Sequence, residues 1–134
     1  MNIPRVIAGG LLAGLILNIG EAVLHGVLLA PQTTEAMHAL GKVEAGGPLG
    51  LTLLVLITFA QGVAGMWLYA ALGGRRSITI GTVLWLLSVV YSSVYLYAGF
   101  PGVFPDGVVW WPVAWGLIEY PLAMLVGATV YREK

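Results

Sequence analysis

The sequence predicts an all-α fold, an integral membrane bundle of four antiparallel helices with both termini in the cytoplasm. Three observations predict it. The chain of 134 residues is 59% hydrophobic and only 9% charged, whereas soluble domains average about 25% charged residues. The apolar residues fall into four long segments of similar length. The basic residues gather at one side of those segments.

The four apolar segments are residues 6–30, 49–72, 78–100 and 108–131, and together they form one four-span domain. At 1.5 Å per residue, each segment covers a hydrocarbon core of about 30 Å with some tilt. Glu21 and His25 interrupt the first segment, which is also too long for a signal peptide, so we expect it to be retained. Ser77 and Asp106 are the expected N-caps of the third and fourth helices.

The connection 31–48 is the longest, and it alone has room for structure outside the bilayer. Thr34 is a suitable N-cap for a short helix over residues 35–40, which Gly41 would end. A loose polar loop fits this connection equally well. The other two connections are short and rich in turn formers.

The basic residues next to the spans predict the orientation. One side of the predicted spans carries Arg5, Arg75, Arg76, Arg132 and Lys134, and the other side carries only Lys42. Because cytoplasmic loops of membrane proteins are enriched in Lys and Arg, both termini are expected in the cytoplasm. We therefore expect a multi-pass protein of the cell's inner membrane, with the lipid bilayer as its main partner.

Composition also excludes several function classes. Six basic and six acidic residues give a net charge of zero, which argues against nucleic acid as a partner. The absence of cysteine removes thiolate metal sites and cysteine nucleophiles. Neither a catalytic Ser/His/Asp arrangement nor a phosphate-binding glycine loop is recognisable, so we expect no cofactor and no enzyme activity.

Polar residues inside the predicted spans lie at similar depths. Counted at 1.5 Å per residue from the basic flanks, they fall about 20–24 Å along their helices, with His25 about one turn further out. Because polar groups are costly in hydrocarbon and usually face the bundle interior, we expect them to form one inward-facing site. The candidate residues are Asn18, Glu21, His25, Gln61, Tyr91, Ser92 and Glu119.

Glu21 and Glu119 would share this interior with no Lys or Arg at their depth. Two neighbouring carboxylates without a cation cannot both stay ionised cheaply. We therefore expect at least one to hold a proton at neutral pH, or the pair to hold a cation. His25 follows Glu21 by four residues and is placed to pair with it. Pro121, which lacks an N–H, is expected to kink the helix beside Glu119.

Three functional interpretations remain open at this point. The polar layer is a site that binds or conducts a proton, a cation or a small solute, or it joins the helices of an accessory subunit in a larger membrane complex. As a third possibility, Glu21, His25 and Glu119 have ligand types found in zinc and iron sites, although their spacing does not require a metal.

Gly10 and Gly14 form a GxxxG pattern in the first segment. Small residues at this spacing let two membrane helices approach closely. The pattern is expected to serve packing within one chain, with a homo-oligomer of two or more copies as the alternative.

Overall fold

The computed structural model describes residues 1–41 and 47–131, and these residues form helices and connections without a strand. Four of the helical stretches are long and apolar enough to span a membrane, namely Ile3–Leu28, Gly47–Ala71, Ser77–Gly99 and Asp106–Ala128. Their ends lie within three residues of the predicted segments. The expected all-helical fold with four apolar helices is therefore confirmed.

Two of the four stretches contain a single π-helical segment. The first consists of α1 (Ile3–Val23) and η1 (Leu24–Leu28), and α2 (Ala30–Ala39) follows directly. The third consists of α4 (Ser77–Trp85), η2 (Leu86–Val90) and α5 (Tyr91–Gly99). The second and fourth are single helices, α3 (Gly47–Ala71) and α6 (Asp106–Ala128).

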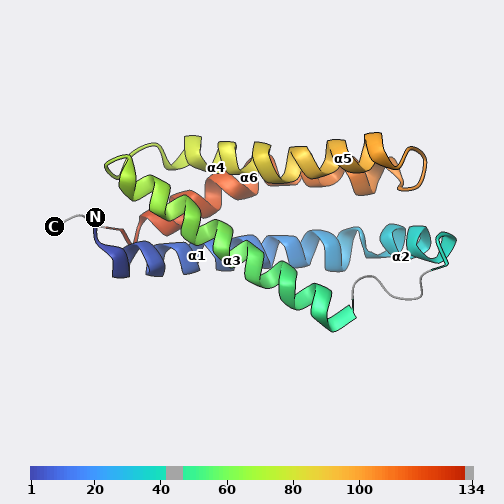
Figure 1. The fold of residues 1–134 in the computed structure, drawn as a ribbon, viewed down its shortest axis with the longest axis horizontal. Coiled ribbons are helices and arrows are strands. Elements are labelled where there is room, and N and C mark those ends of the chain that lie inside the picture. The colour runs from blue at the N-terminus through green and yellow to red at the C-terminus, as the bar shows by residue number, and fades with distance from the viewer. Residues whose placement is uncertain (42–46, 132–134) are drawn as a thin grey trace.

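Contacts among the helices centre on α1 and α6. α1 packs against both α3 and α6, while α4 packs mainly against α6. The N-terminus and the α3–α4 connection lie at one end of the molecule, and α2 and the α5–α6 connection lie at the other (Figure 1). α3 crosses α1 and diverges from it toward Gly47 (Figure 1). The beginning of α3 is consequently left without helical neighbours on most sides.

Glycines allow α1 and α3 to touch along their backbones. A Cβ atom on Gly62 would lie 2.6 Å from the backbone nitrogen of Gly14, and one on Gly10 would lie 2.5 Å from the Cα of Val63. Real Cβ atoms do not approach other atoms so closely, so these positions require glycine. Gly10 and Gly14 thus lie against α3 of the same chain.

The contact of α1 with α6 uses a different face of α1. Gly9 and Gly127 meet backbone to backbone, and a Cβ on Gly127 would lie 2.6 Å from the carbonyl oxygen of Gly9. Earlier in α6, Pro121 lies with its backbone against Gly81 of α4. The core fills the space between these contacts with Ala13, Leu17, Ile80, Val89, Tyr120, Ala123 and Met124.

The two expected N-caps are wrong. Ser77 is the first residue of α4 and follows Arg76, whose left-handed backbone (φ 67°) ends the preceding turn without a side-chain cap. Asp106 lies in the first turn of α6, after Pro105. An acidic side chain in the first turn still interacts favourably with the helix dipole. Asp106 therefore suits the start of α6 although it does not cap it.

The short helix outside the first span exists, but its predicted start is wrong. α2 begins at Ala30, so Thr34 lies inside it and does not cap it. Pro31 occupies the first turn, where a missing N–H removes no hydrogen bond. The predicted end is closer, because Gly41 follows the helix with a positive φ of 70°.

Three of the basic residues that predict the orientation lie outside the described ranges. Lys42, Arg132 and Lys134 belong to that part of the chain. Among the described residues, the N-terminal segment with Arg5 and the α3–α4 connection with Arg75 and Arg76 lie at the same end of the molecule (Figure 1).

Candidate functional site

Glu119 is the one buried acidic side chain among the residues that the structure describes, with 6% of its surface exposed. Neither of its carboxyl oxygens, Oε1 or Oε2, accepts a hydrogen bond of good geometry, and the nearest donor is the indole N–H of Trp115, one turn earlier in α6. An unpaired carboxylate away from water costs far more free energy than a neutral or paired one. A carboxyl in this position therefore needs either a bound proton or a cation beside it.

Gly20 of α1 provides the surface on which this carboxyl lies. A Cβ atom added to Gly20 would overlap Oε1 of Glu119 and lie 2.6 Å from its Cδ. Any larger residue at position 20 would therefore displace the carboxyl. The missing side chain lets Glu119 reach from α6 directly onto the α1 backbone.

Glu119 also lines a cavity of about 300 Å³ between α1 and α6. Trp115, one turn earlier in α6, contributes an indole Nε1 that is buried and without a hydrogen-bond partner. The other lining residues are apolar, so Glu119 and Trp115 are the lining residues with polar side-chain groups, and the carboxyl oxygens and the indole nitrogen are themselves buried. The lining of the cavity consists of Ile16, Ile19, Gly20, Trp115, Ile118, Glu119 and Leu122.

The cavity opens at the exposed faces of α1 and α6. Ile19 of α1 and Ile118 of α6 line it and are themselves exposed, Ile118 to 72%. Leu122, in the next turn of α6, is also exposed. The cavity that Glu119 lines is therefore open at an edge formed by apolar side chains.

Glu21 of α1 and His25 of η1 contact each other, one turn apart, next to this site. Nε2 of His25 lies 3.1 Å from Oε2 of Glu21, and both side chains are partly exposed. Glu21 follows Gly20, against which the Glu119 carboxyl lies. The pair thus begins directly after the residue of α1 that contacts the buried carboxyl.

Two further predicted residues take part in other contacts. The hydroxyl of Tyr120 donates a hydrogen bond of 3.0 Å to Oε1 of Gln61, which joins α6 to α3. The amide of Asn18 donates to the carbonyl oxygen of Gly14 at 2.9 Å and, at 3.5 Å, to that of Val55 in α3. Both contacts join helices and satisfy polar groups.

The expected inward orientation of Tyr91 and Ser92 is wrong. Tyr91 is 69% exposed, and Ser92 is exposed and donates to the carbonyl oxygen of Val89 in its own helix. Ser93 is the buried serine of this segment. The π-helical turn at Leu86–Val90 adds a residue to the helix and rotates all later side chains, so a count of depth could not give their direction.

The three weak metal candidates do not form a metal site. In the described part of the chain, no group of three or more His, Asp or Glu residues could hold a metal ion. Glu21 and His25 pair with each other at the outer edge, while Glu119 lies beneath Gly20. The structure therefore does not bring Glu21, His25 and Glu119 together as one group of metal ligands.

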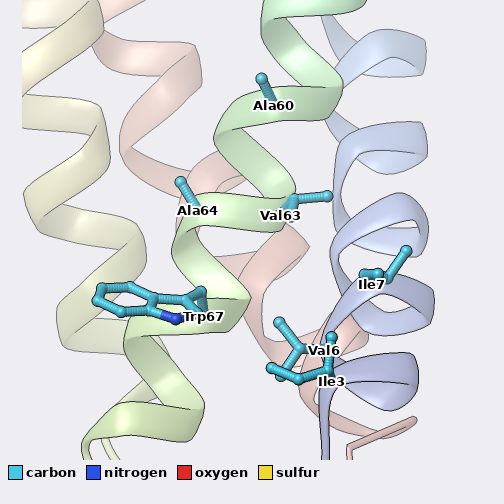
Figure 2. A pocket seen from close by; sticks show the side chains of 7 residues that line it. All are labelled: Ile3, Val6, Ile7, Ala60, Val63, Ala64 and Trp67. Atoms are coloured by element: carbon cyan, nitrogen blue, oxygen red, sulfur yellow. The ribbon is translucent and has the colours of Figure 1, made fainter.

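A second cavity, of about 490 Å³, lies between the first turns of α1 and the second half of α3. Figure 2 shows Ile3, Val6 and Ile7 on one helix facing Val63 on the other. Its remaining lining residues are Ala60, Ala64 and Trp67, so it offers no acidic or basic group. Of the residues that line these two cavities, Glu119 is the acidic one, and none is basic.

Sequence reasoning missed Gly20, Trp115 and Tyr120 as members of the polar region. Each is next to a predicted residue or one turn from it: Gly20 precedes Glu21, Trp115 precedes Glu119 by four positions, and Tyr120 follows it. The spacing of Trp115 and Glu119 places both on one side of a helix, which was a usable signal. Nothing comparable indicated that Gly20 faces α6.

No protein-family model, no curated protein and no solved structure matches this chain.

Proposed function

We propose that this chain is a multi-pass protein of the inner membrane in which Glu119 binds a proton and exchanges it for a cation or a small solute. One observation carries the proposal: a buried carboxyl with both oxygens unpartnered lines a cavity that is open to one side. Ionisable groups within membrane spans commonly mark such binding sites. Gln61 and Asn18 join the surrounding helices and are structural in this account.

Glu21 and His25 serve as the proton route in this proposal. Their side chains are in contact and partly exposed, and Glu21 follows Gly20, against which the Glu119 carboxyl lies. Histidine gains and loses protons near neutral pH. A proton leaving Glu119 therefore has a neighbouring carboxylate and imidazole on its way to water.

The membrane arrangement that goes with this function is an antiparallel bundle with cytoplasmic termini. It is supported by the four apolar helices and by the excess of Lys and Arg on one side of them. A reporter enzyme that works only in the periplasm, fused after Lys134, is expected to be inactive. An active fusion would contradict the orientation.

An apolar carbodiimide tests the proposed site. Such a reagent partitions into lipid and reacts with carboxyls that carry a proton, so we expect it to modify Glu119 in protein reconstituted into liposomes. Mass spectrometry of the peptides locates the modified residue. Glu119→Gln should abolish the modification, whereas Glu35→Gln, at an exposed position of α2 outside the candidate spans, should leave it unchanged. Modification confined to Glu21, or none at all, would refute the proposal.

The second candidate function is that of an accessory subunit in a larger membrane complex. The first half of α3 favours it, because apolar residues from Leu49 to Ile57 are exposed where α3 diverges from α1. A partner helix would cover this surface, and the exposed Leu53 is a suitable attachment point for a cross-linker. The chain has no cysteine, so Leu53→Cys gives one cross-linking site. This candidate predicts defined cross-linked products, together with full function of Glu119→Gln in the intact complex.

A further inference from the structure

The cavity beside Glu119 is larger than proton binding requires. Its volume of about 300 Å³ is at the lower end of the range of about 300–1,000 Å³ that is typical of small-molecule sites. A hydrated metal ion needs several polar ligands, whereas this cavity offers one carboxyl and one indole N–H. Its shape and lining therefore suit an apolar molecule with one polar group.

The polar groups of the cavity specify the charge of that molecule. The two oxygens of Glu119 accept hydrogen bonds or pair with a cation, and apart from the nearby indole N–H of Trp115 they have no polar partner in the described part of the chain. The ring of Trp115 lines the same cavity, and an indole face attracts organic cations. Both groups thus favour a positively charged occupant.

We propose that the cavity between α1 and α6 binds an apolar organic ammonium ion, which enters from the lipid and takes the place of the proton on Glu119. This inference rests on the proposed function of Glu119 and names the class of solute that the carboxyl exchanges for its proton. Ile19, Ile118 and Leu122 form the apolar entrance, because they line the cavity and are exposed on the outer surface.

The exchange balances in protons and in charge. The Glu119 carboxyl releases one proton, the ammonium ion pairs with the resulting carboxylate, and no covalent bond to carbon forms or breaks. The cavity stays neutral overall, which avoids the cost of an unpaired buried charge. The proton leaves toward Glu21 and His25 and then to water.

Few other titratable groups face Glu119 from the helices packed against α6. Glu21 of α1 follows Gly20, against which the Glu119 carboxyl lies, and it contacts His25. The neighbour of Glu119 in α6, Tyr120, is hydrogen-bonded to Gln61 of α3. α4 and η2 carry no acidic or basic side chain. Binding of a permanent cation should therefore strengthen by about tenfold per pH unit over the range in which Glu119 is protonated, because each bound cation displaces one proton.

Tetrapropylammonium is a suitable probe, and tetrapropylsilane is a neutral control of nearly the same shape. With purified full-length protein in weakly buffered detergent solution, a pH-sensitive dye should record the release of about one proton per chain on addition of the ammonium, because protonation and binding are linked. Glu119→Gln should release none, and Glu35→Gln should behave as the unmodified protein. Trp115→Leu should weaken binding at least tenfold while a saturating concentration still releases the proton.

Carbodiimide labelling separates failure of this inference from failure of the proposed function. Saturating tetrapropylammonium should slow the labelling of Glu119 at least tenfold, and tetrapropylsilane should slow it far less. If Glu119 is labelled but neither proton release nor protection follows, the ammonium site is refuted and the proton site stands. Equal protection by both probes would show that charge is not recognised and would also refute it. If Glu119 is never labelled, the proposed function fails and this inference fails with it.

Discussion

At the scale of single residues, the position of the Glu119 carboxyl depends on the missing side chain of Gly20 in α1. Oε1 of Glu119 occupies the space that a Cβ of Gly20 would fill, so the position of the carboxyl is set by the lack of a side chain on another helix. Glu119 itself was predictable, because an acidic residue within an apolar span is conspicuous. Its contact with Gly20 was not, because depth along a helix does not give direction around it, and the predicted counterpart Glu21 is partly exposed and contacts His25.

The hydrogen bond between Tyr120 and Gln61 should contribute measurably to stability. Tyr120→Phe leaves Oε1 of Gln61 without this donor, so we expect a loss of about 0.5–1.5 kcal/mol in the free energy of unfolding. A double-mutant cycle with Gln61→Leu, followed by denaturation in mixed micelles, measures the coupling. Tyr95→Phe, at an exposed position, is the control and should change stability little. Additive effects of the two core substitutions would show that the hydrogen bond is not formed.

At the scale of helices, glycines decide which faces meet. α1 uses Gly10 and Gly14 toward α3, and Gly9 and Gly20 toward α6. The sequence predicted the first pair through its GxxxG spacing. The second face and the inward residues of the third span were not predictable, since the π-helical turn at Leu86–Val90 interrupts the regular rotation that a helical count assumes.

Glycine substitutions in α3 test this packing. Gly62→Ala places a Cβ 2.6 Å from the backbone nitrogen of Gly14, and such overpacking typically costs about 1–3 kcal/mol. Gly50→Ala in the same helix is the matched control, because nothing lies within 4 Å of its Cβ position. It should leave the free energy of unfolding unchanged or raise it by about 0.5–1 kcal/mol, since alanine is the better helix former. Similar effects of both substitutions would contradict the backbone contact between α1 and α3.

At the scale of the whole molecule, hydropathy alone predicted four apolar helices, because length and composition suffice for that inference. It could not predict that they leave a cavity between α1 and α6, or that the start of α3 diverges from its neighbours. Both features depend on how the helices pack against one another, and glycines lie at several of those contacts. The site is thus a product of the assembled helices, although each of its residues is visible in the sequence.

The central claim is that Glu119 holds an exchangeable proton, and infrared spectroscopy of the protein in lipid tests it most directly. A free glutamate loses its proton near about pH 4.3, so an ordinary carboxyl is mostly ionised at about pH 6. The account predicts a carbonyl stretching band from a protonated carboxyl at that pH, present in the unmodified protein and in Glu21→Gln but absent in Glu119→Gln. A spectrum in which all carboxyls are already ionised at about pH 5, or a band that survives in Glu119→Gln, would contradict it.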